Sequence, residues 1–348
     1  MFFTLPIVLP VAGFAAFTKL RLMGRSHKRY DTGQPVTFET DPGSPGIAAV
    51  EDYLYENFIK PAQDGSSTSN KLSAKRERFE QKGLTRDFPV TFTPGTVEMD
   101  GLSVDGEWTQ APGADPDQRI LYLHGGAFTV GSAISHRSLI TNIALRTGCS
   151  VFAPNYRLMP ENKRQDAIDD ARAAYKWILE NGPDGPAPVK KLAVAGDSAG
   201  GNLTLMLSNW VRNQGLRPAD AVVGISPATD STFESPSIKQ NFETDSMLKP
   251  LAGPLVKLPR AVLVWAGRAQ MGISPAAPRV SPLRANLSGL PPTLIHVSSS
   301  EMLYDDARRY VSKAQAQGSP AVLQSWSNMC HVWHAFDTML PEAHHAFD

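Results

Sequence analysis

Short apolar runs alternate with longer amphipathic stretches from residue 86 onward. The runs are four or five residues long, as in strands, and the amphipathic stretches repeat apolar residues every three or four positions, as in helices. Strands are expected at residues 120–123, 151–154, 192–195, 222–226, 293–297 and 322–326. Helices are expected at residues 136–147, 166–180, 202–213 and 303–317. This alternation predicts an α/β fold with a mostly parallel central sheet and helices on both faces.

Residues 1–85 follow a different pattern. Helices are expected at residues 47–59 and 72–82, and loops at residues 41–46 and 64–70. From Phe88 onward, alternating residues predict an antiparallel pair of edge strands. We therefore expect an N-terminal apolar segment and helical cap at residues 1–85, followed by the α/β domain at residues 86–348. Residues 230–256 interrupt the alternation, which predicts a cap insertion in that domain.

The N-terminus is strongly apolar over residues 1–17, and five basic residues follow it: Lys19, Arg21, Arg25, Lys28 and Arg29. Three interpretations remain open. Residues 1–29 fit a membrane-surface segment or short anchor with a basic flank. They also fit an apolar segment over the active site, or a targeting peptide whose charges follow the apolar core instead of preceding it. The protein is therefore expected in the cytoplasm or associated with a membrane.

Charge and cysteine content exclude several classes of protein. The 34 basic and 34 acidic residues balance, so no nucleic-acid partner is expected. Two cysteines, Cys149 and Cys330, do not make a disulfide framework. The chain has no Cys-x-x-Cys, no His-Glu-x-x-His and no Gly-x-x-x-x-Gly-Lys motif, so no metal or organic cofactor is expected.

A serine stands between two glycines in the sequence Gly196-Asp197-Ser198-Ala199-Gly200. An expected strand precedes this pentapeptide and an expected helix follows it. Glycines let the strand and the helix approach closely enough to hold the serine on a strained turn, with its hydroxyl exposed at the top of the sheet. This arrangement is typical of the nucleophile of a serine hydrolase.

A second motif, Leu123-His124-Gly125-Gly126, also follows an expected strand. Acyl transfer develops negative charge on the carbonyl oxygen, which backbone N–H groups can bind when no side chain obstructs them. We expect Gly125 and Gly126 to supply two such groups and Ala199 a third. His124 is expected to hold this loop by hydrogen bonds.

A serine nucleophile needs an acid and a base on loops after later strands. Glu301 is the first carboxylate after the expected strand at 293–297, and Asp305 is its main rival. His331 is the first histidine after the strand at 322–326, and His334 is the alternative base. The predicted order along the chain is therefore serine, acid, histidine.

These motifs resemble those of the hormone-sensitive-lipase-like family of α/β-hydrolases, which includes bacterial class IV esterases. The resemblance covers residues 85–348 and rests on His124-Gly125-Gly126-Ala127-Phe128, Tyr156-Arg157-Leu158-Met159-Pro160-Glu161, Gly196-Asp197-Ser198-Ala199-Gly200-Gly201 and His331-Val332-Trp333. It implies a serine carboxylesterase without a cofactor, acting through an acyl-enzyme on short- to medium-chain or lipophilic esters. In the order nucleophile, acid and base, the family's triad falls on Ser198, Glu301 and His331.

One departure from the family pattern is Asn162-Lys163-Arg164-Gln165, which stands where a His-x-x-Pro sequence is usual. Two alternatives to an esterase stay open at this point. One is a ligand-binding, receptor-like protein on a hydrolase scaffold, and the other is a lactonase or lyase that uses the same site. The oligomeric state is not predicted by any of these patterns.

Overall fold

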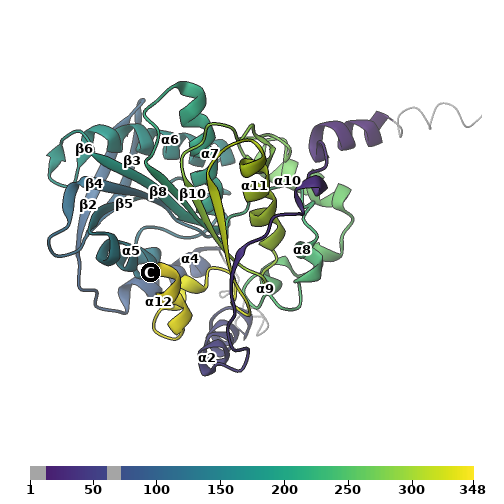
Figure 1. Cartoon of the computed structure of the whole chain (residues 1–348), viewed down its shortest axis with the longest axis horizontal. Helices are drawn as coiled ribbons and strands as arrows, with labels where there is room; N and C mark the ends of the chain where they lie inside the picture. Colours follow the sequence, from purple (N-terminus) through teal and green to yellow (C-terminus); the bar gives the residue numbers. More distant parts are fainter. Residues whose placement is uncertain (1–12, 61–71) are drawn as a thin grey trace, which may run out of the picture.

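A nine-stranded sheet forms the centre of the computed structural model, which describes residues 13–60 and 72–348 (Figure 1). The strand order is β1-β11-β10-β9-β8-β4-β5-β3-β2. In this spatial order the first seven strands, which begin with β1 and end with β5, pair in parallel. Strands β2 and β3 form an antiparallel pair at one edge. The mostly parallel sheet and the antiparallel edge pair expected from the sequence are confirmed.

The strands match the apolar runs of the sequence. Their bounds are β1 (Val36–Phe38), β2 (Thr91–Met99), β3 (Leu102–Gln110), β4 (Asp115–Leu123), β5 (Cys149–Pro154), β8 (Lys191–Asp197), β9 (Ala221–Ile225), β10 (Thr293–Ser298) and β11 (Ala321–Trp326). A separate two-stranded sheet joins β6 (Asn181–Gly182) and β7 (Gly185–Pro186).

Helices cover both faces of the sheet, with α6, α7 and α11 on one face and α5 and α12 on the other (Figure 1). Their bounds are α5 (Arg137–Thr147), α6 (Arg164–Glu180), α7 (Ser198–Gln214), α11 (Tyr304–Ala316) and α12 (Pro341–Phe347). Successive residues of a strand face opposite sides, so Leu121 joins the core under α6 and α7, while Ile120 joins the core under α5.

The N-terminal part contributes to the sheet as well as to its cover. Residues 13–23 are helical and end in the π-helix η1 (Thr18–Met23). Strand β1 then pairs with β11, so three residues of this part belong to the central sheet. The remaining elements are η2 (Lys28–Tyr30), α2 (Pro45–Leu54), η3 (Tyr55–Ile59) and α4 (Leu72–Leu84). Residues 1–12 and the loop expected at 64–70 lie outside the described residues.

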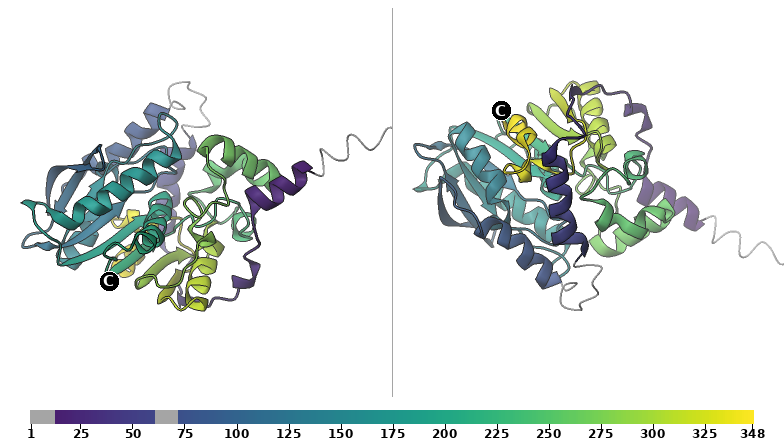
Figure 2. Two further views of the ribbon diagram at one scale, coloured as in Figure 1. Left: turned by 90° about the horizontal axis from the view of Figure 1, so that it is seen from above. Right: turned by 90° about the horizontal axis from the view of Figure 1, so that it is seen from below.

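The insertion between β9 and β10 is longer than the stretch 230–256 expected from the sequence. It contains α8 (Ser237–Gln240), α9 (Lys249–Ala252), η5 (Gly253–Lys257), α10 (Arg260–Met271) and η6 (Pro282–Arg284). Both views in Figure 2 show the N-terminal helix lying against α10 at one end of the molecule. Within the described residues, no helix is both long and apolar enough to span a bilayer.

The close packing of α7 against β4 leads to a stability prediction. A Cβ atom on Gly200 would lie 1.8 Å from the carbonyl oxygen of Leu123, which is backbone and cannot rotate away. Gly200→Ala should therefore lower the free energy of unfolding by about 3 kcal/mol, measured by urea denaturation.

Gly267→Ala is the matched control for this substitution. A Cβ on Gly267 meets only side-chain atoms at 3.5 Å or more in helix α10, so alanine should be neutral or stabilise the protein by up to about 1 kcal/mol. Equal unfolding curves for Gly200→Ala and the unsubstituted protein would contradict the prediction.

Candidate active site

Ser198 lies on a sharp turn at the junction of β8 and α7. Its φ is +51°, in the left-handed region that non-glycine residues rarely occupy. The flanking glycines permit the turn, because a Cβ on Gly196 would lie 2.5 Å from the carbonyl oxygen of Leu123. Strain of this kind persists only when the surrounding structure enforces it. The turn therefore holds the Ser198 hydroxyl at the carboxyl edge of the sheet.

A chain of hydrogen bonds joins three side chains at that edge. The Nε2 atom of His331 is 2.9 Å from Ser198 Oγ, and its Nδ1 atom is 2.5 Å from Glu301 Oε2. Ser198 follows β8, Glu301 follows β10 and His331 follows β11. The structure thus brings together the serine, acid and histidine singled out in the sequence, in the predicted order.

The carboxylate of Glu301 is completely buried and held on both oxygens. While Oε2 faces His331, Oε1 accepts hydrogen bonds from the Ser298 N–H at 2.7 Å and from Ser226 Oγ at 2.9 Å. Ser226 also accepts the Val332 N–H at 3.2 Å, which fixes the backbone next to His331. Sequence analysis missed Ser226, which carries no motif and simply follows the end of β9.

The charge environment favours a proton on His331. Burial alone would lower the pKa of the His331 imidazole, but the hydrogen bond and the charge of Glu301 outweigh burial and raise that pKa. Burial also raises the pKa of Glu301, against the effect of His331. A second buried carboxylate, Asp245, contributes to both shifts and accepts the Met302 N–H at 2.8 Å. Sequence analysis missed Asp245 because it lies in the insertion, far from any motif.

The alternative acid, Asp305, and the alternative base, His334, make contacts outside this hydrogen-bond chain. Asp305 accepts the Ser237 N–H at 2.8 Å and pairs with Arg308 at 2.6 Å, so it holds helix α8 to helix α11. His334 Nε2 is 3.1 Å from His296 Nδ1 in a buried, stacked pair. Burial holds the pKa of His334 well below its usual value, so this ring is neutral. Neither rival contacts Ser198 or His331 among the described contacts.

The glycine loop after β4 differs from expectation at Gly125. The Gly125 N–H donates to Asp197 Oδ1 at 2.9 Å, and Tyr122 Oη donates to the same oxygen at 2.7 Å. This N–H therefore points into the protein and is occupied. Within the described residues, no group accepts a hydrogen bond from the N–H of Gly126 or Ala127. The N–H of Ala199 is in the first turn of α7, where helices leave their N–H groups without an internal acceptor.

Buried aromatic and imidazole rings support this loop from beneath. Tyr156 Oη donates to the His124 carbonyl at 2.6 Å, and the two rings stack with centroids 4.1 Å apart. Burial lowers the pKa of His124 to about 3, so its ring is neutral. His136 Nε2 lies 3.2 Å from the Gly125 nitrogen and 3.5 Å from Asp197 Oδ2. The Nδ1 atom of His124 lies 2.8 Å from the Gly125 carbonyl oxygen, so His124 makes the hydrogen bond to the loop that was expected. His136 is a supporting residue that no sequence motif indicated.

The carboxylate of Asp197 stays ionised beneath the loop. Burial opposes its ionisation, but the charge and hydrogen bond of His136 and the hydrogen bond of Tyr122 hold its pKa below the usual value. An ionised Asp197 is a strong acceptor for the Gly125 N–H. The residue directly before Ser198 thus fixes the conformation of the loop opposite Ser198.

Arg164 belongs to the segment Asn162-Lys163-Arg164-Gln165, which differs from the usual family sequence, and it packs against the same loop. Its side chain is buried, its Nη2 donates to Asn202 Oδ1 at 2.7 Å, and its guanidinium carbon lies 3.5 Å from the centre of the Phe128 ring. Burial lowers the pKa of Arg164 to about 9, which leaves it charged at neutral pH. A cation–π contact therefore helps to fix Phe128. No cluster of three or more metal-binding side chains occurs in residues 13–60 and 72–348.

A family model described as alpha/beta hydrolase fold matches residues 120–335. The chain belongs to the α/β-hydrolase family. It is similar to an acetyl-hydrolase of Streptomyces hygroscopicus, with 36% identity over 73% of this chain and 80% of that protein. It is also similar to an esterase of Acinetobacter venetianus, with 34% identity over 84% of this chain and 92% of that protein.

Solved structures that are similar to this chain are also esterases. An esterase from the bacterial hormone-sensitive lipase family matches with a TM-score of 0.73 and 32% identity, covering 87% of this chain and 95% of that one. An esterase/lipase from an uncultured bacterium matches with a TM-score of 0.73 and 34% identity, covering 88% and 96%. The expected resemblance and fold class are confirmed. The protein is a carboxylic ester hydrolase, and small-molecule esters are its substrates.

The geometry around His331 leads to a prediction about its protonation. Because Glu301 raises the pKa of His331, the imidazole should titrate above the usual histidine value of about 6.5. Glu301→Gln removes the carboxylate but leaves the burial, so the pKa of His331 should then fall below that value. NMR titration of the imidazole resonances measures both values.

Asp305→Asn is the control for this titration, because it neutralises a nearby buried carboxylate that does not contact His331. It should leave the His331 titration where it is. The prediction fails if Asp305→Asn shifts the titration as much as Glu301→Gln does.

Proposed function

We propose that Ser198, His331 and Glu301 hydrolyse the ester as nucleophile, base and acid. The continuous hydrogen-bond chain from Ser198 Oγ through His331 to Glu301 is the observation that supports this assignment. Ser198 Oγ attacks the ester carbonyl carbon while His331 Nε2 accepts the hydroxyl proton. Glu301 keeps the proton of His331 on Nδ1 and stabilises the imidazolium that forms.

The reaction then proceeds in two stages, each with its own tetrahedral intermediate. The bond to the leaving alcohol breaks, and His331 returns its proton to the alkoxide oxygen, which leaves an acyl group on Ser198. A water molecule next attacks the acyl carbon while His331 accepts its proton. The second intermediate releases the carboxylic acid, and the proton on His331 returns to Ser198.

We assign the oxyanion hole to the N–H groups of Gly126, Ala127 and Ala199. This assignment replaces Gly125 with Ala127, because the Gly125 N–H is already bonded to Asp197. Ala127 has a φ of +52°, so the chain reverses direction at this residue. Each correctly oriented donor lowers the barrier by roughly 3 kcal/mol. An alanine at this position leaves the N–H accessible because its methyl group is small.

We further propose that the N-terminal part and the β9–β10 insertion form a cap that selects lipophilic esters of short to medium chain length. Val50 and Leu54 of α2 pack in one apolar cluster with Trp333, two residues after His331. Met247 of the insertion packs against the same cluster. Apolar side chains from both parts therefore pack beside the segment that carries His331, which favours an apolar acyl group.

Ser198→Ala should abolish hydrolysis of p-nitrophenyl butyrate and labelling by a fluorophosphonate probe, because among the described residues Ser198 carries the only hydroxyl hydrogen-bonded to His331. The expected loss in kcat is at least about 10⁴-fold, measured spectrophotometrically on folded protein.

The matched control is Ser103→Ala, which removes an exposed hydroxyl from strand β3. It should keep full activity and full labelling. Persistent labelling of the Ser198→Ala variant would refute Ser198 as the nucleophile.

A series of p-nitrophenyl esters tests the acyl preference. The value of kcat/KM should be highest for short or medium chains and fall for long ones. Met247→Ala should shift the optimum to longer chains because it removes bulk from the apolar wall. Leu145→Ala, on the exposed side of α5, should leave the profile unchanged. A profile that is flat, or that Met247→Ala does not alter, would exclude this account of the cap.

A further inference from the structure

Exposed hydrophobic side chains concentrate in two segments of the chain. Of the 13 large hydrophobic residues that are exposed in the described structure, seven lie within residues 13–23 and 249–262. They are Phe14, Phe17, Leu20, Leu251, Leu255, Leu258 and Val262. Leu20 is the most exposed of them, at 74%. We call these seven side chains, together with the exposed basic residues Lys19, Arg21 and Lys257, the apolar–basic surface.

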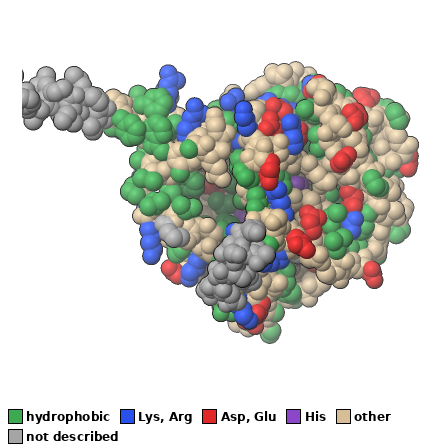
Figure 3. Space-filling view, turned by 180° about the vertical axis from the view of Figure 1, so that it is seen from behind, with side chains coloured by type: hydrophobic (Ala, Val, Ile, Leu, Met, Phe, Trp, Pro, Cys, Tyr) green, Lys and Arg blue, Asp and Glu red, His purple; other side chains and the backbone are tan. Residues whose placement is uncertain are grey.

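Contacts between the N-terminal helix and α10 join the two segments. The ring of Phe14 stacks on Trp265 at 5.1 Å and that of Phe17 at 5.9 Å, and Trp265 Nε1 donates to Thr18 Oγ1 at 3.0 Å. Figure 3 shows hydrophobic side chains gathered at one end of the molecule, with Lys and Arg side chains around them. The two segments therefore present one continuous surface.

Basic residues without acidic ones mark the two stretches of the chain that contain the segments of this surface. Residues 1–30 contain five Lys and Arg and residues 246–300 contain six, whereas neither stretch contains an Asp or Glu. The rest of the chain holds 23 of the 34 basic residues and all 34 acidic ones, so it is strongly acidic although the whole protein is neutral. Lys19, Arg21 and Lys257 are exposed and form no ion pair with any described carboxylate.

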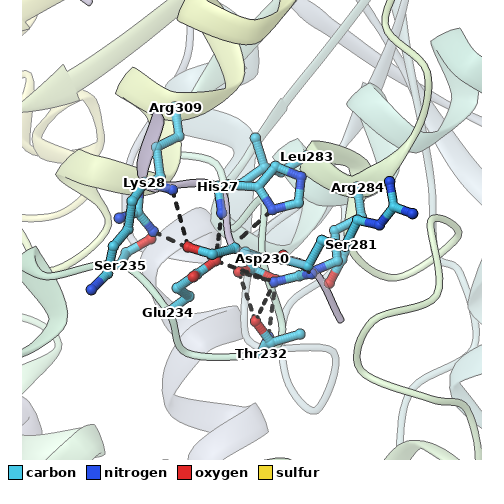
Figure 4. A network of polar contacts seen from close by, with 12 residues as sticks. His27, Lys28, Asp230, Thr232, Glu234, Ser235, Ser281, Leu283, Arg284 and Arg309 are labelled. Atoms are coloured by element: carbon cyan, nitrogen blue, oxygen red, sulfur yellow. Dashed lines mark hydrogen bonds and ion pairs between the residues drawn. The ribbon is translucent and has the colours of Figure 1, made fainter. Parts of the chain in front are cut away.

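The N-terminal helix is firmly attached to the rest of the molecule. Figure 4 shows the polar network that holds the segment following this helix. The His27 N–H donates to Glu234 Oε2 at 3.0 Å, and Arg284 Nη1 donates to the Arg25 carbonyl at 3.0 Å. Burial lowers the pKa of His27 to about 4, so the network keeps one protonation state near neutral pH. Hydrogen bonds therefore hold the segment after this helix to the β9–β10 insertion.

We propose that the apolar–basic surface binds the surface of an anionic phospholipid bilayer. Apolar side chains on a helix with a basic flank are the usual composition of an interfacial membrane segment. Each Lys or Arg near an anionic bilayer adds attraction, and no described carboxylate forms an ion pair with the exposed Lys19, Arg21 or Lys257. A second copy of the chain is a poor occupant, because two such surfaces carry the same sign of charge. Binding would hold the hydrolase beside lipophilic esters dissolved in the bilayer.

Vesicle flotation with the full-length protein tests the proposal. The protein should float with vesicles of phosphatidylcholine and phosphatidylglycerol, float poorly with phosphatidylcholine alone, and dissociate at high salt. Lys19→Gln together with Arg21→Gln should weaken binding by about fivefold for each charge removed. Leu20→Ser together with Val262→Ser should weaken it at every salt concentration, because these changes remove exposed apolar side chains that would enter the bilayer.

Matched controls lie away from this surface. One control is Lys190→Gln with Lys191→Gln, at the start of β8 and so at the end of that strand away from Ser198. The other is Leu145→Ser, on α5. Both variants should bind vesicles as the unsubstituted protein does. All variants should unfold in urea at the same midpoint as the unsubstituted protein, which verifies folding independently of both lipid binding and catalysis. Since flotation does not depend on catalysis, its failure is distinct from failure of the proposed mechanism.

Three results would overturn the proposal. The first is no flotation with anionic vesicles at low salt. The second is flotation that the surface variants reduce no more than the control variants do. The third is a concentration-dependent dimer, seen by light scattering, that Leu20→Ser with Val262→Ser dissociates while vesicles bind neither form. That result would assign the surface to a second copy of the chain.

Discussion

The buried carboxylate of Glu301 connects the ends of three neighbouring strands. Its oxygens accept hydrogen bonds from Ser226 after β9, from Ser298 at the end of β10 and from the imidazole of His331 after β11. A buried carboxylate without partners would cost several kcal/mol, so each of these donors stabilises the loop that carries it. The geometry around Ser198 depends on this carboxylate, because it fixes both the position and the tautomer of His331.

A second buried carboxylate, Asp197, connects two loops in the other half of the site. It joins the β8 turn to the β4 loop through the Gly125 N–H and the Tyr122 hydroxyl. The two acids differ in their charge environment. His136 and Tyr122 hold the pKa of Asp197 down, whereas burial raises the pKa of Glu301 despite its contact with His331. Asp197 therefore acts as a fixed negative charge, and Glu301 is suited to share a proton with an imidazole.

The sequence predicted which strands Ser198, Glu301 and His331 follow, because each of their motifs is local. Ser198, Glu301 and His331 each follow an apolar run, and hydrophobic periodicity identifies such runs well. Strand β1 escaped prediction because it has only three residues, too few to display a period. The insertion was underestimated because α10 resembles any other amphipathic helix of the α/β domain. Periodicity reports which residues are buried, not which distant elements they meet.

The direction of the Gly125 N–H, and the roles of Ser226 and Asp245, depend on contacts between residues far apart in the sequence. Asp306 illustrates the difficulty most clearly. It falls in the first turn of the helix expected at residues 303–317, a position typical of a solvated charge, yet it is buried and accepts the N–H groups of Thr229 and Asp230 at 2.7 and 2.8 Å. Burial raises its pKa to about 7. Carboxylates buried in this way fasten the insertion to helix α11. A sequence pattern cannot distinguish them from solvated ones because these partners are backbone groups, which every residue possesses.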